Sequence, residues 1–185
     1  MRISKNFRSD QETISRFVTA LGRGSVILST TKFAHPDFFI SAHSFIRDYI
    51  EDGFFKKEEL LIKTLEDSGF PTESGPVGAI LGDHKKTREA AELLANAAIQ
   101  WRAGDEIARS EVGWATSQYT SAIREHLERL RNLIFPLLEQ TISVDEEHKL
   151  SEEINKIVFE GGLKEGTDKY IKLIEALEEE LSDWR

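Results

Sequence analysis

The chain has 185 residues, of which 33 are Asp or Glu and 24 are Lys or Arg, so its formal net charge is −9. It has five histidines and no cysteine, which excludes disulfide scaffolds, thiolate zinc sites and cysteine nucleophiles. Any metal must therefore be held by histidine, carboxylate or water. The acidic balance argues against nucleic acid or an anionic membrane as a partner. No run of about 18 apolar residues predicts a membrane span, and the polar N-terminus lacks a signal-peptide pattern, so we expect a cytoplasmic protein.

Apolar residues recur at helical spacing almost throughout, which predicts an all-α fold. A first helix is expected over about 10–21, ending at Gly22-Arg23-Gly24. The stretch after these glycines could extend that helix or form a loop. A second helix is expected to begin with His35 as N-cap before a proline and to run to about residue 65. Gly53 is expected to interrupt it, because the apolar stripe rotates there.

The rest of the chain divides at glycine and proline positions. Pro136 removes an amide donor and is expected to kink the fourth segment near its end. Ser143 is a candidate N-cap with Glu146 as its capping-box partner. The remaining helices are expected over about 77–101, 105–139 and 143–159, with a last helix after Gly161-Gly162.

Four long amphipathic segments joined by short turns predict an antiparallel up-down-up-down four-helix bundle. One or two additional C-terminal helices are expected to pack onto this bundle. We expect one domain over residues 1–185, with the core bundle over about 8–140 and a C-terminal helical extension over about 143–185. The acidic run 175–180 is interpreted as a solvated helix face.

Three polar side chains fall in the middle of apolar stripes, where a buried polar group must find a partner. Glu58 lies on the second segment, His84 on the third and His126 on the fourth. Gln11, on the first segment, is a fourth inward-facing candidate. Two imidazoles and one carboxylate match a two-His-one-carboxylate metal site, which suits iron(II) and leaves coordination positions open. Glu59, about 100° further around its helix, is a fallback ligand.

The same residues also have a plain structural interpretation. A histidine on an apolar stripe is more often a hydrogen-bonded core residue than a ligand, and Glu58 could pair with a cation such as Arg88. Tyr119 could line the pocket or be an ordinary core tyrosine. The other three histidines are interpreted as a helix cap, a stripe edge and a solvated surface residue: His35, His43 and His148.

Three segments carry a resemblance to the hemerythrin-like, or HHE cation-binding, family. Residues 45–62, FIRDYIEDGFFKKEELLI, are similar to the family pattern FIRxYxDxxHHxKEExxLF. Residues 75–88, GPVGAILGDHKKTR, are similar to GPxxxMLxEHxxxR, and residues 126–136, HLERLRNLIFP, to HIxKENxxLFP. The order of these segments, their spacing and the positions of the Gly-Pro and Phe-Pro dipeptides agree with the family pattern over about residues 10–175.

The resemblance implies a di-iron site with one His on the first helix, an H-x-x-x-E pair on the second, one His on the third and another such pair on the fourth. This sequence keeps three of the six ligand positions, Glu58, His84 and His126. The other three positions carry Gln11, Phe54 and Leu130. In the family arrangement the first two of these replace terminal ligands of one iron. The resemblance therefore implies that one iron site is lost and that the other could hold a single ion.

By this resemblance the chain is expected to be a binding or sensing protein for iron, O2 or NO rather than an enzyme. The expected cofactor is one non-heme iron ion, with zinc and manganese as alternatives. The alternative hypothesis, of a different class, is a metal-free bundle that acts as a protein interaction or signalling module. Two observations favour it: three ligand positions are lost, and the last helix is strongly acidic. The sequence leaves open whether the chain forms a homo-oligomer.

Overall fold

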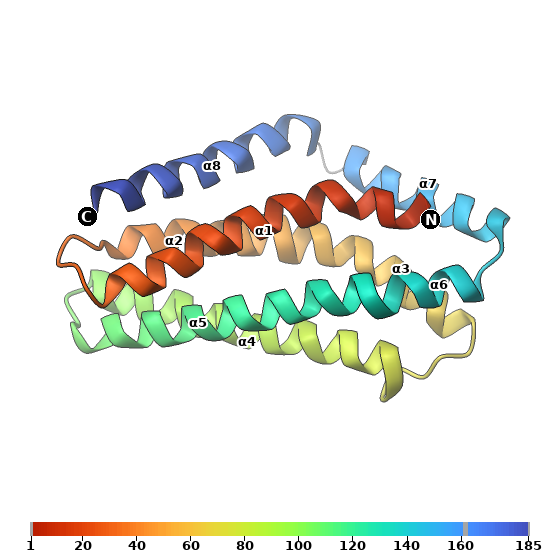
Figure 1. Ribbon diagram of the computed structural model, residues 1–185, viewed down its shortest axis with the longest axis horizontal. Coiled ribbons are helices and arrows are strands. Elements are labelled where there is room, and N and C mark those ends of the chain that lie inside the picture. The colour runs from red at the N-terminus through yellow and green to blue at the C-terminus, as the bar shows by residue number, and fades with distance from the viewer. Residues whose placement is uncertain (1, 161–162, 185) are drawn as a thin grey trace.

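The computed structural model describes residues 2–160 and 163–184, and within them every regular element is a helix (Figure 1). The elements are α1 (Arg2–Leu28), α2 (Pro36–Phe45), η1 (Ile46–Phe54), α3 (Phe55–Asp67), α4 (Gly75–Arg102), α5 (Ile107–Arg129), η2 (Leu130–Ile134), α6 (Phe135–Thr141), α7 (Val144–Glu160) and α8 (Leu163–Asp183). None of these helices combines the length and the apolar character needed to cross a membrane.

The helices form an antiparallel bundle with two helices laid against it. Four rods alternate in direction, namely α1, then α2–η1–α3, then α4, then α5–η2–α6 (Figure 1). Helix α7 then runs back alongside α1 and α3, and α8 continues alongside α1 and α2 (Figure 1). The described chain ends near the turn between α1 and α2. This confirms the predicted all-α four-helix bundle with additional C-terminal helices.

Helix α1 is longer than predicted at both ends, and the prediction that Gly22-Arg23-Gly24 ends it is wrong. The helix begins at Arg2 because Ile3 and Phe7 are buried one turn apart, and it continues to Leu28. Gly24 is needed for close packing: a Cβ atom there would lie 2.6 Å from Cε1 of Phe38. A helical glycine costs only about 1 kcal/mol relative to alanine, so a long, well-packed helix tolerates it.

The second and fourth rods each contain a π-helical stretch where the sequence suggested a break. Gly53 does not interrupt the second rod, which stays helical through η1, and the apolar stripe rotates because wider π turns insert extra residues. In the fourth rod the distortion lies just before Pro136. The amide of Phe135 donates to the carbonyl of Leu130 in the i→i−5 pattern, so the chain adjusts upstream of the proline.

Other local predictions can be compared with the structure. The His35 ring accepts a hydrogen bond from the amide of Asp37, which confirms the N-cap of α2. The capping box of α7 is formed, since the Ser143 amide donates to Glu146 Oε2 at 2.7 Å and the Glu146 amide donates to Ser143 Oγ at 3.2 Å. Gly161-Gly162 lies outside the described residues. Two large apolar residues, Leu81 of α4 and Leu133 of η2, are more than one-third exposed, at 38% and 40% respectively.

The core is rich in phenylalanine, and α8 covers part of it. Phe17 stacks on Phe45 with ring centroids 4.1 Å apart. Tyr170 of α8 lies edge-on to Phe45 at 5.9 Å, and Trp184 packs against Phe38 at 4.8 Å. The C-terminal helix is thus anchored to α2 by Tyr170 within α8 and by Trp184 directly after it.

Candidate metal centre

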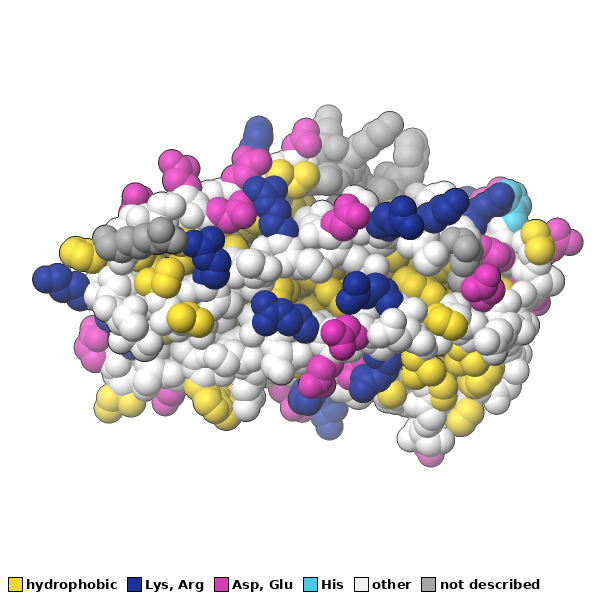
Figure 2. All heavy atoms as spheres, viewed as in Figure 1, with side chains coloured by type: hydrophobic (Ala, Val, Ile, Leu, Met, Phe, Trp, Pro, Cys, Tyr) yellow, Lys and Arg dark blue, Asp and Glu magenta, His cyan; other side chains and the backbone are white. Residues whose placement is uncertain are grey.

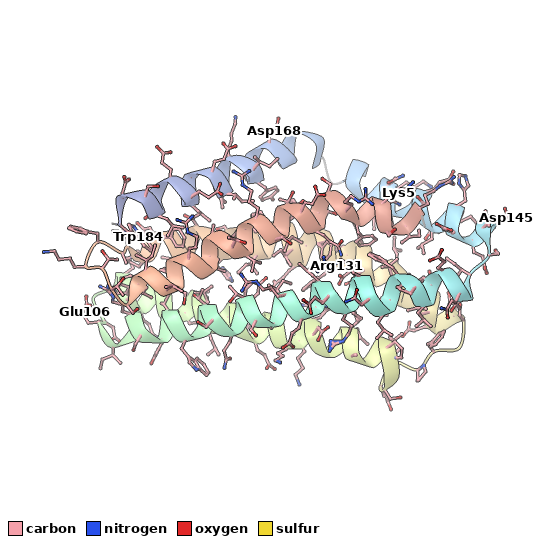
Figure 3. The ribbon with its side chains drawn as sticks, viewed as in Figure 1. Lys5, Glu106, Arg131, Asp145, Asp168 and Trp184 are labelled. Atoms are coloured by element: carbon pink, nitrogen blue, oxygen red, sulfur yellow. The ribbon has the colours of Figure 1, made fainter. Side chains whose placement is uncertain are left out.

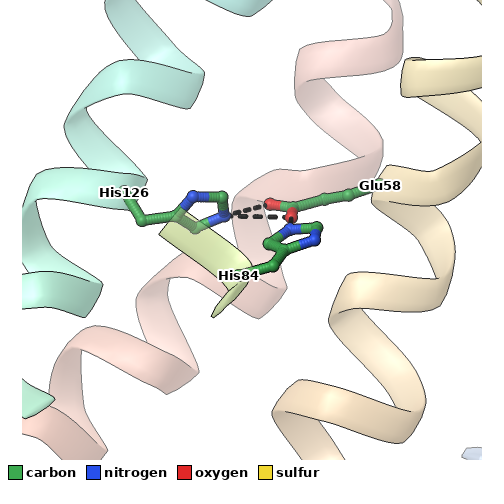
Figure 4. Close-up of side chains that lie close together, drawn as sticks. All are labelled: Glu58, His84 and His126. Atoms are coloured by element: carbon green, nitrogen blue, oxygen red, sulfur yellow. Dashed lines mark hydrogen bonds and ion pairs between the residues drawn. The ribbon is translucent and has the colours of Figure 1, made fainter. Parts of the chain in front are cut away.

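Glu58, His84 and His126 meet inside the bundle, each from a different rod (Figure 4). Glu58 Oε2 lies 2.5 Å from His84 Nε2, and Glu58 Oε1 lies 2.7 Å from His126 Nε2. The exposed fractions of the three residues are 1%, 4% and 0%, respectively. One potential ligand atom from each residue lies within 4.8 Å of the other two. The predicted trio is therefore brought together, at one level of the bundle.

The local helical geometry aims these side chains inward. Glu58 lies in the first turn of α3, directly after the π-helical η1, whose extra residues rotate the following side chains toward the core. His84 and His126 lie within the long helices α4 and α5, which pack closely against each other. The three donors are therefore mounted on helices rather than on loops.

Two residues that sequence reasoning missed extend the cluster. Asp83 Oδ2 accepts a hydrogen bond from His126 Nδ1 at 3.1 Å, and Arg129 Nη1 donates to both oxygens of Asp83 at 2.9 Å. A carboxylate behind an imidazole fixes which ring nitrogen faces a metal. Two features of the sequence could have indicated Asp83 and Arg129. Asp83 directly precedes His84, and Arg129 follows His126 by about one helical turn.

Charges are balanced within this cluster. Burial of His126 disfavours its charged form, but Glu58 and Asp83 outweigh the burial and raise its pKa to about 9. Burial likewise raises the pKa of Glu58, but His126 and His84 outweigh it, so that the net pKa is lowered. At neutral pH an ionised Glu58 thus accepts hydrogen bonds from both imidazoles, and His126 carries a positive charge.

Apolar side chains enclose the cluster. The ring of Phe55 stacks on His84 at 4.1 Å and lies edge-on to His126 at 5.5 Å. Leu130 borders a very small apolar cavity beside Glu58, and Phe54 packs against Phe7 at 5.7 Å. Hydrocarbon therefore fills two of the positions where the resemblance placed lost ligands.

The remaining candidates do not join the cluster. Glu59, the fallback ligand, is exposed and pairs with Lys56 at 3.5 Å, outside the cluster. Arg88 lies over the ring of Phe55 at 5.9 Å rather than on Glu58. Gln11 is half-buried, and Tyr119 is a buried core residue; within the described part of the chain neither Gln11 Nε2 nor the Tyr119 hydroxyl has a hydrogen-bond partner.

The three other histidines lie outside the centre. His35 caps α2, His43 is half-buried, and His148 is exposed with Nε2 3.1 Å from Glu152. These placements agree with the roles that the sequence suggested for them.

Comparison with protein families identifies the fold. The model of the Hemerythrin HHE cation binding domain matches residues 5–138. The chain belongs to this hemerythrin family. Comparison with curated proteins and with solved structures found no match. The matched region contains Glu58, His84 and His126 and ends before the Ser143 cap of α7.

The donor set of this hemerythrin-like chain fits one metal ion. Metal bonds to imidazole nitrogen and carboxylate oxygen of about 2.0–2.2 Å place neighbouring ligand atoms about 3 Å apart. The Glu58 oxygens lie 2.5 and 2.7 Å from the two Nε2 atoms, so an ion would require each imidazole nitrogen to move away from its carboxylate oxygen by less than about 1 Å. The ring nitrogens that face Glu58 are both Nε2, and Asp83 already holds the opposite nitrogen of His126.

Proposed function

We propose that this protein binds a single non-heme metal ion, iron(II) by preference, through Glu58, His84 and His126, and that it serves as a binding or sensing protein for iron, O2 or NO. The observation that carries the proposal is the convergence of one buried carboxylate and two buried imidazoles from three rods. A two-His-one-carboxylate ion keeps coordination positions open for a small ligand.

The surrounding residues support a binding role. Glu58 supplies negative charge, the Asp83–Arg129 pair orients His126, and Phe55 excludes water from one side of both imidazoles. Arg129 is engaged by Asp83 and is not free to clamp an organic cosubstrate. We therefore favour binding or sensing over catalysis.

Metal analysis of protein purified after anaerobic, iron-replete growth tests the proposal. We expect close to one equivalent of a transition metal, and loss of most of it in His84→Ala and His126→Ala. His43→Ala, which changes a histidine outside the cluster, is the matched control and should keep its metal. Less than about a tenth of an equivalent in the unaltered protein would contradict the proposal.

The same contacts give the second hypothesis its specific support. Glu58, His126, Asp83 and Arg129 satisfy one another by hydrogen bonds, as a metal-free core would require. Under this hypothesis the bundle is an interaction or signalling module without a metal. Added Fe(II) or Zn(II) would then leave the melting temperature unchanged, whereas an ion that binds the folded state raises it.

A further inference from the structure

A groove lies between α1 and α5 and contains no residue of the candidate metal centre. Its volume is about 1120 Å³, and it is formed by the second half of α1, the loop that follows, part of α5 and Trp184. Figure 2 views this face, and Figure 3 shows Trp184 at the end of the molecule where α1 turns into α2. The groove lies open to solvent and is large enough for a small organic molecule.

The charges that line this groove have one sign. Arg23, Lys32 and Arg124 line it, and no Asp or Glu belongs to its described lining. This local excess of positive charge occurs in a chain whose formal net charge is −9. Arg23 and Arg124 make no hydrogen bond or ion pair with any described residue. Two guanidinium groups are therefore available for an anion.

The threonine hydroxyl groups of the lining are not available to donate hydrogen bonds to an anion. Thr30 donates to the carbonyl of Ile27, and Thr31 donates to the carbonyl of Trp184. Because these hydroxyl hydrogens are already used, the donors available to an incoming oxyanion are mainly the charged ones. Guanidinium pairs bind carboxylate or phosphate oxygens strongly through charge-assisted hydrogen bonds.

Apolar side chains complete the lining. Val26 is 71% exposed and Phe33 is 59% exposed, both among the largest exposures of apolar residues in the described chain. Lys32 lies over the Phe33 ring at 5.6 Å, so charge and apolar surface are adjacent. A ligand that matches both would carry an oxyanion at one end and hydrocarbon at the other.

We propose that this groove binds a small organic anion, a carboxylate or phosphate monoester attached to an apolar body. Arg23 and Arg124 hold the oxyanion, Lys32 adds positive charge, and the apolar body lies against Val26 and Phe33. The groove shares no residue with the candidate metal centre.

Titration calorimetry with four probes tests the proposal: octanoate, octyl phosphate, inorganic phosphate and 1-octanol. We expect octanoate or octyl phosphate to bind at least about tenfold more tightly than inorganic phosphate or 1-octanol, since only the first two offer both charge and hydrocarbon. The preferred probe of the two identifies the oxyanion. Its affinity should fall in high salt, because the exposed guanidinium groups are screened.

The double variant Arg23→Gln/Arg124→Gln should lose about tenfold or more in affinity for the preferred probe. Arg8→Gln/Arg131→Gln is the matched control, since it removes two exposed arginines of α1 and η2 that lie outside the lining of the groove. Figure 3 shows Arg131 on the same side of the molecule. The control should bind the probe as the unaltered protein does. Metal content measured in all three proteins checks that the metal centre is intact.

Several results would overturn the proposal. These are no binding of either octyl anion at millimolar concentration, equal binding of 1-octanol, or equal loss in the two double variants. Sedimentation provides a further test. If the protein self-associates and only Arg23→Gln/Arg124→Gln abolishes the association, the groove accepts a second copy of this acidic chain, and the small-anion site is wrong.

Discussion

In the proposed metal site, a metal ion would have to compete with a proton for Nε2 of His126. Glu58 and Asp83 raise the pKa of this ring to about 9 against the opposing effect of burial, so the metal-free protein holds the proton at neutral pH. Metal can bind this nitrogen only after the proton leaves. Two acidic neighbours that attract a cation thus also stabilise the protonated ring.

The affinity for metal is therefore expected to rise with pH. Below a pKa of about 9 each metal ion bound displaces one proton from His126, so the apparent affinity should increase about tenfold per pH unit and level off above that pKa. Zn(II) titrations by calorimetry at pH 6.5 and 7.5, each in two buffers of different ionisation enthalpy, measure the affinity and the proton release. An affinity independent of pH, with no proton released, would contradict this account.

Asp83 is expected to matter for metal binding without contacting the metal. The change Asp83→Asn weakens the contact that orients His126 and should lower metal affinity about 10- to 100-fold. Asp48→Asn, which breaks an exposed pair with Arg47, is the control and should leave affinity unchanged. Competition with a chelator of known affinity measures both, and equal affinities in the two variants would rule out the role of Asp83.

At the scale of the element, glycines and π turns adjust the helices to one another. Gly24 lies against the ring of Phe38, whereas Gly22 has more room, its nearest neighbour being Arg124 Nη2 at 3.7 Å from an added Cβ. Both glycines lie inside α1, so the same backbone accommodates both. The difference between them comes from the packing against other elements.

This difference gives a matched pair of substitutions. Gly24→Ala should destabilise the fold by about 1–3 kcal/mol, because its Cβ atom, 2.6 Å from Cε1, would displace the buried ring of Phe38. Gly22→Ala should instead stabilise the fold by up to about 1 kcal/mol through helix propensity. Urea denaturation measures the free energy of unfolding, and a Gly24→Ala protein as stable as Gly22→Ala would refute the packing explanation.

At the scale of the whole molecule, α8 belongs to the same hydrophobic core as the bundle. Ile174, Leu177 and Leu181 are buried together with the side chains of α1 and α2, and Trp184 packs against Phe38. The family match ends at residue 138, so these contacts attach the C-terminal helices to the matched region. We expect the bundle and α8 to unfold as one cooperative unit.

Leu181→Ala tests this cooperativity. Removing a fully buried leucine side chain should cost about 2–5 kcal/mol and shift one common transition. Circular dichroism reports the helices. The change in tryptophan fluorescence mainly reports the packing around the buried Trp101 and Trp184, because Trp114 is already 59% exposed in the folded protein. The two signals should change together, whereas an early, separate loss of α8 would show that it is an independent element. The exposed substitution Glu179→Ala is the control and should change stability by less than about 0.5 kcal/mol.

Much of this organisation could be predicted from the sequence. Apolar spacing predicted the all-α bundle, Ser143 with Glu146 predicted a cap, and the stripe positions of Glu58, His84 and His126 predicted three inward polar groups. These succeed because they depend on periodicity along a single helix, which the order of residues determines. The absence of cysteine and the replacement of three family ligand positions likewise restricted the possible metal sites before any contact was known.

Only the tertiary structure decided which helices meet and at what level. The role of Gly24 depends on Phe38, and the Asp83–Arg129 pair behind His126 joins α4 to α5, so neither follows from the spacing on a single helix. The level of Glu58 in the bundle depends on the π turns of η1. The sequence indicated these turns only indirectly, as an expected break at Gly53. The sequence by itself determined the inventory of one carboxylate and two imidazoles. Their convergence required the packing of three rods, because distances between helices are set by side chains far apart in the chain.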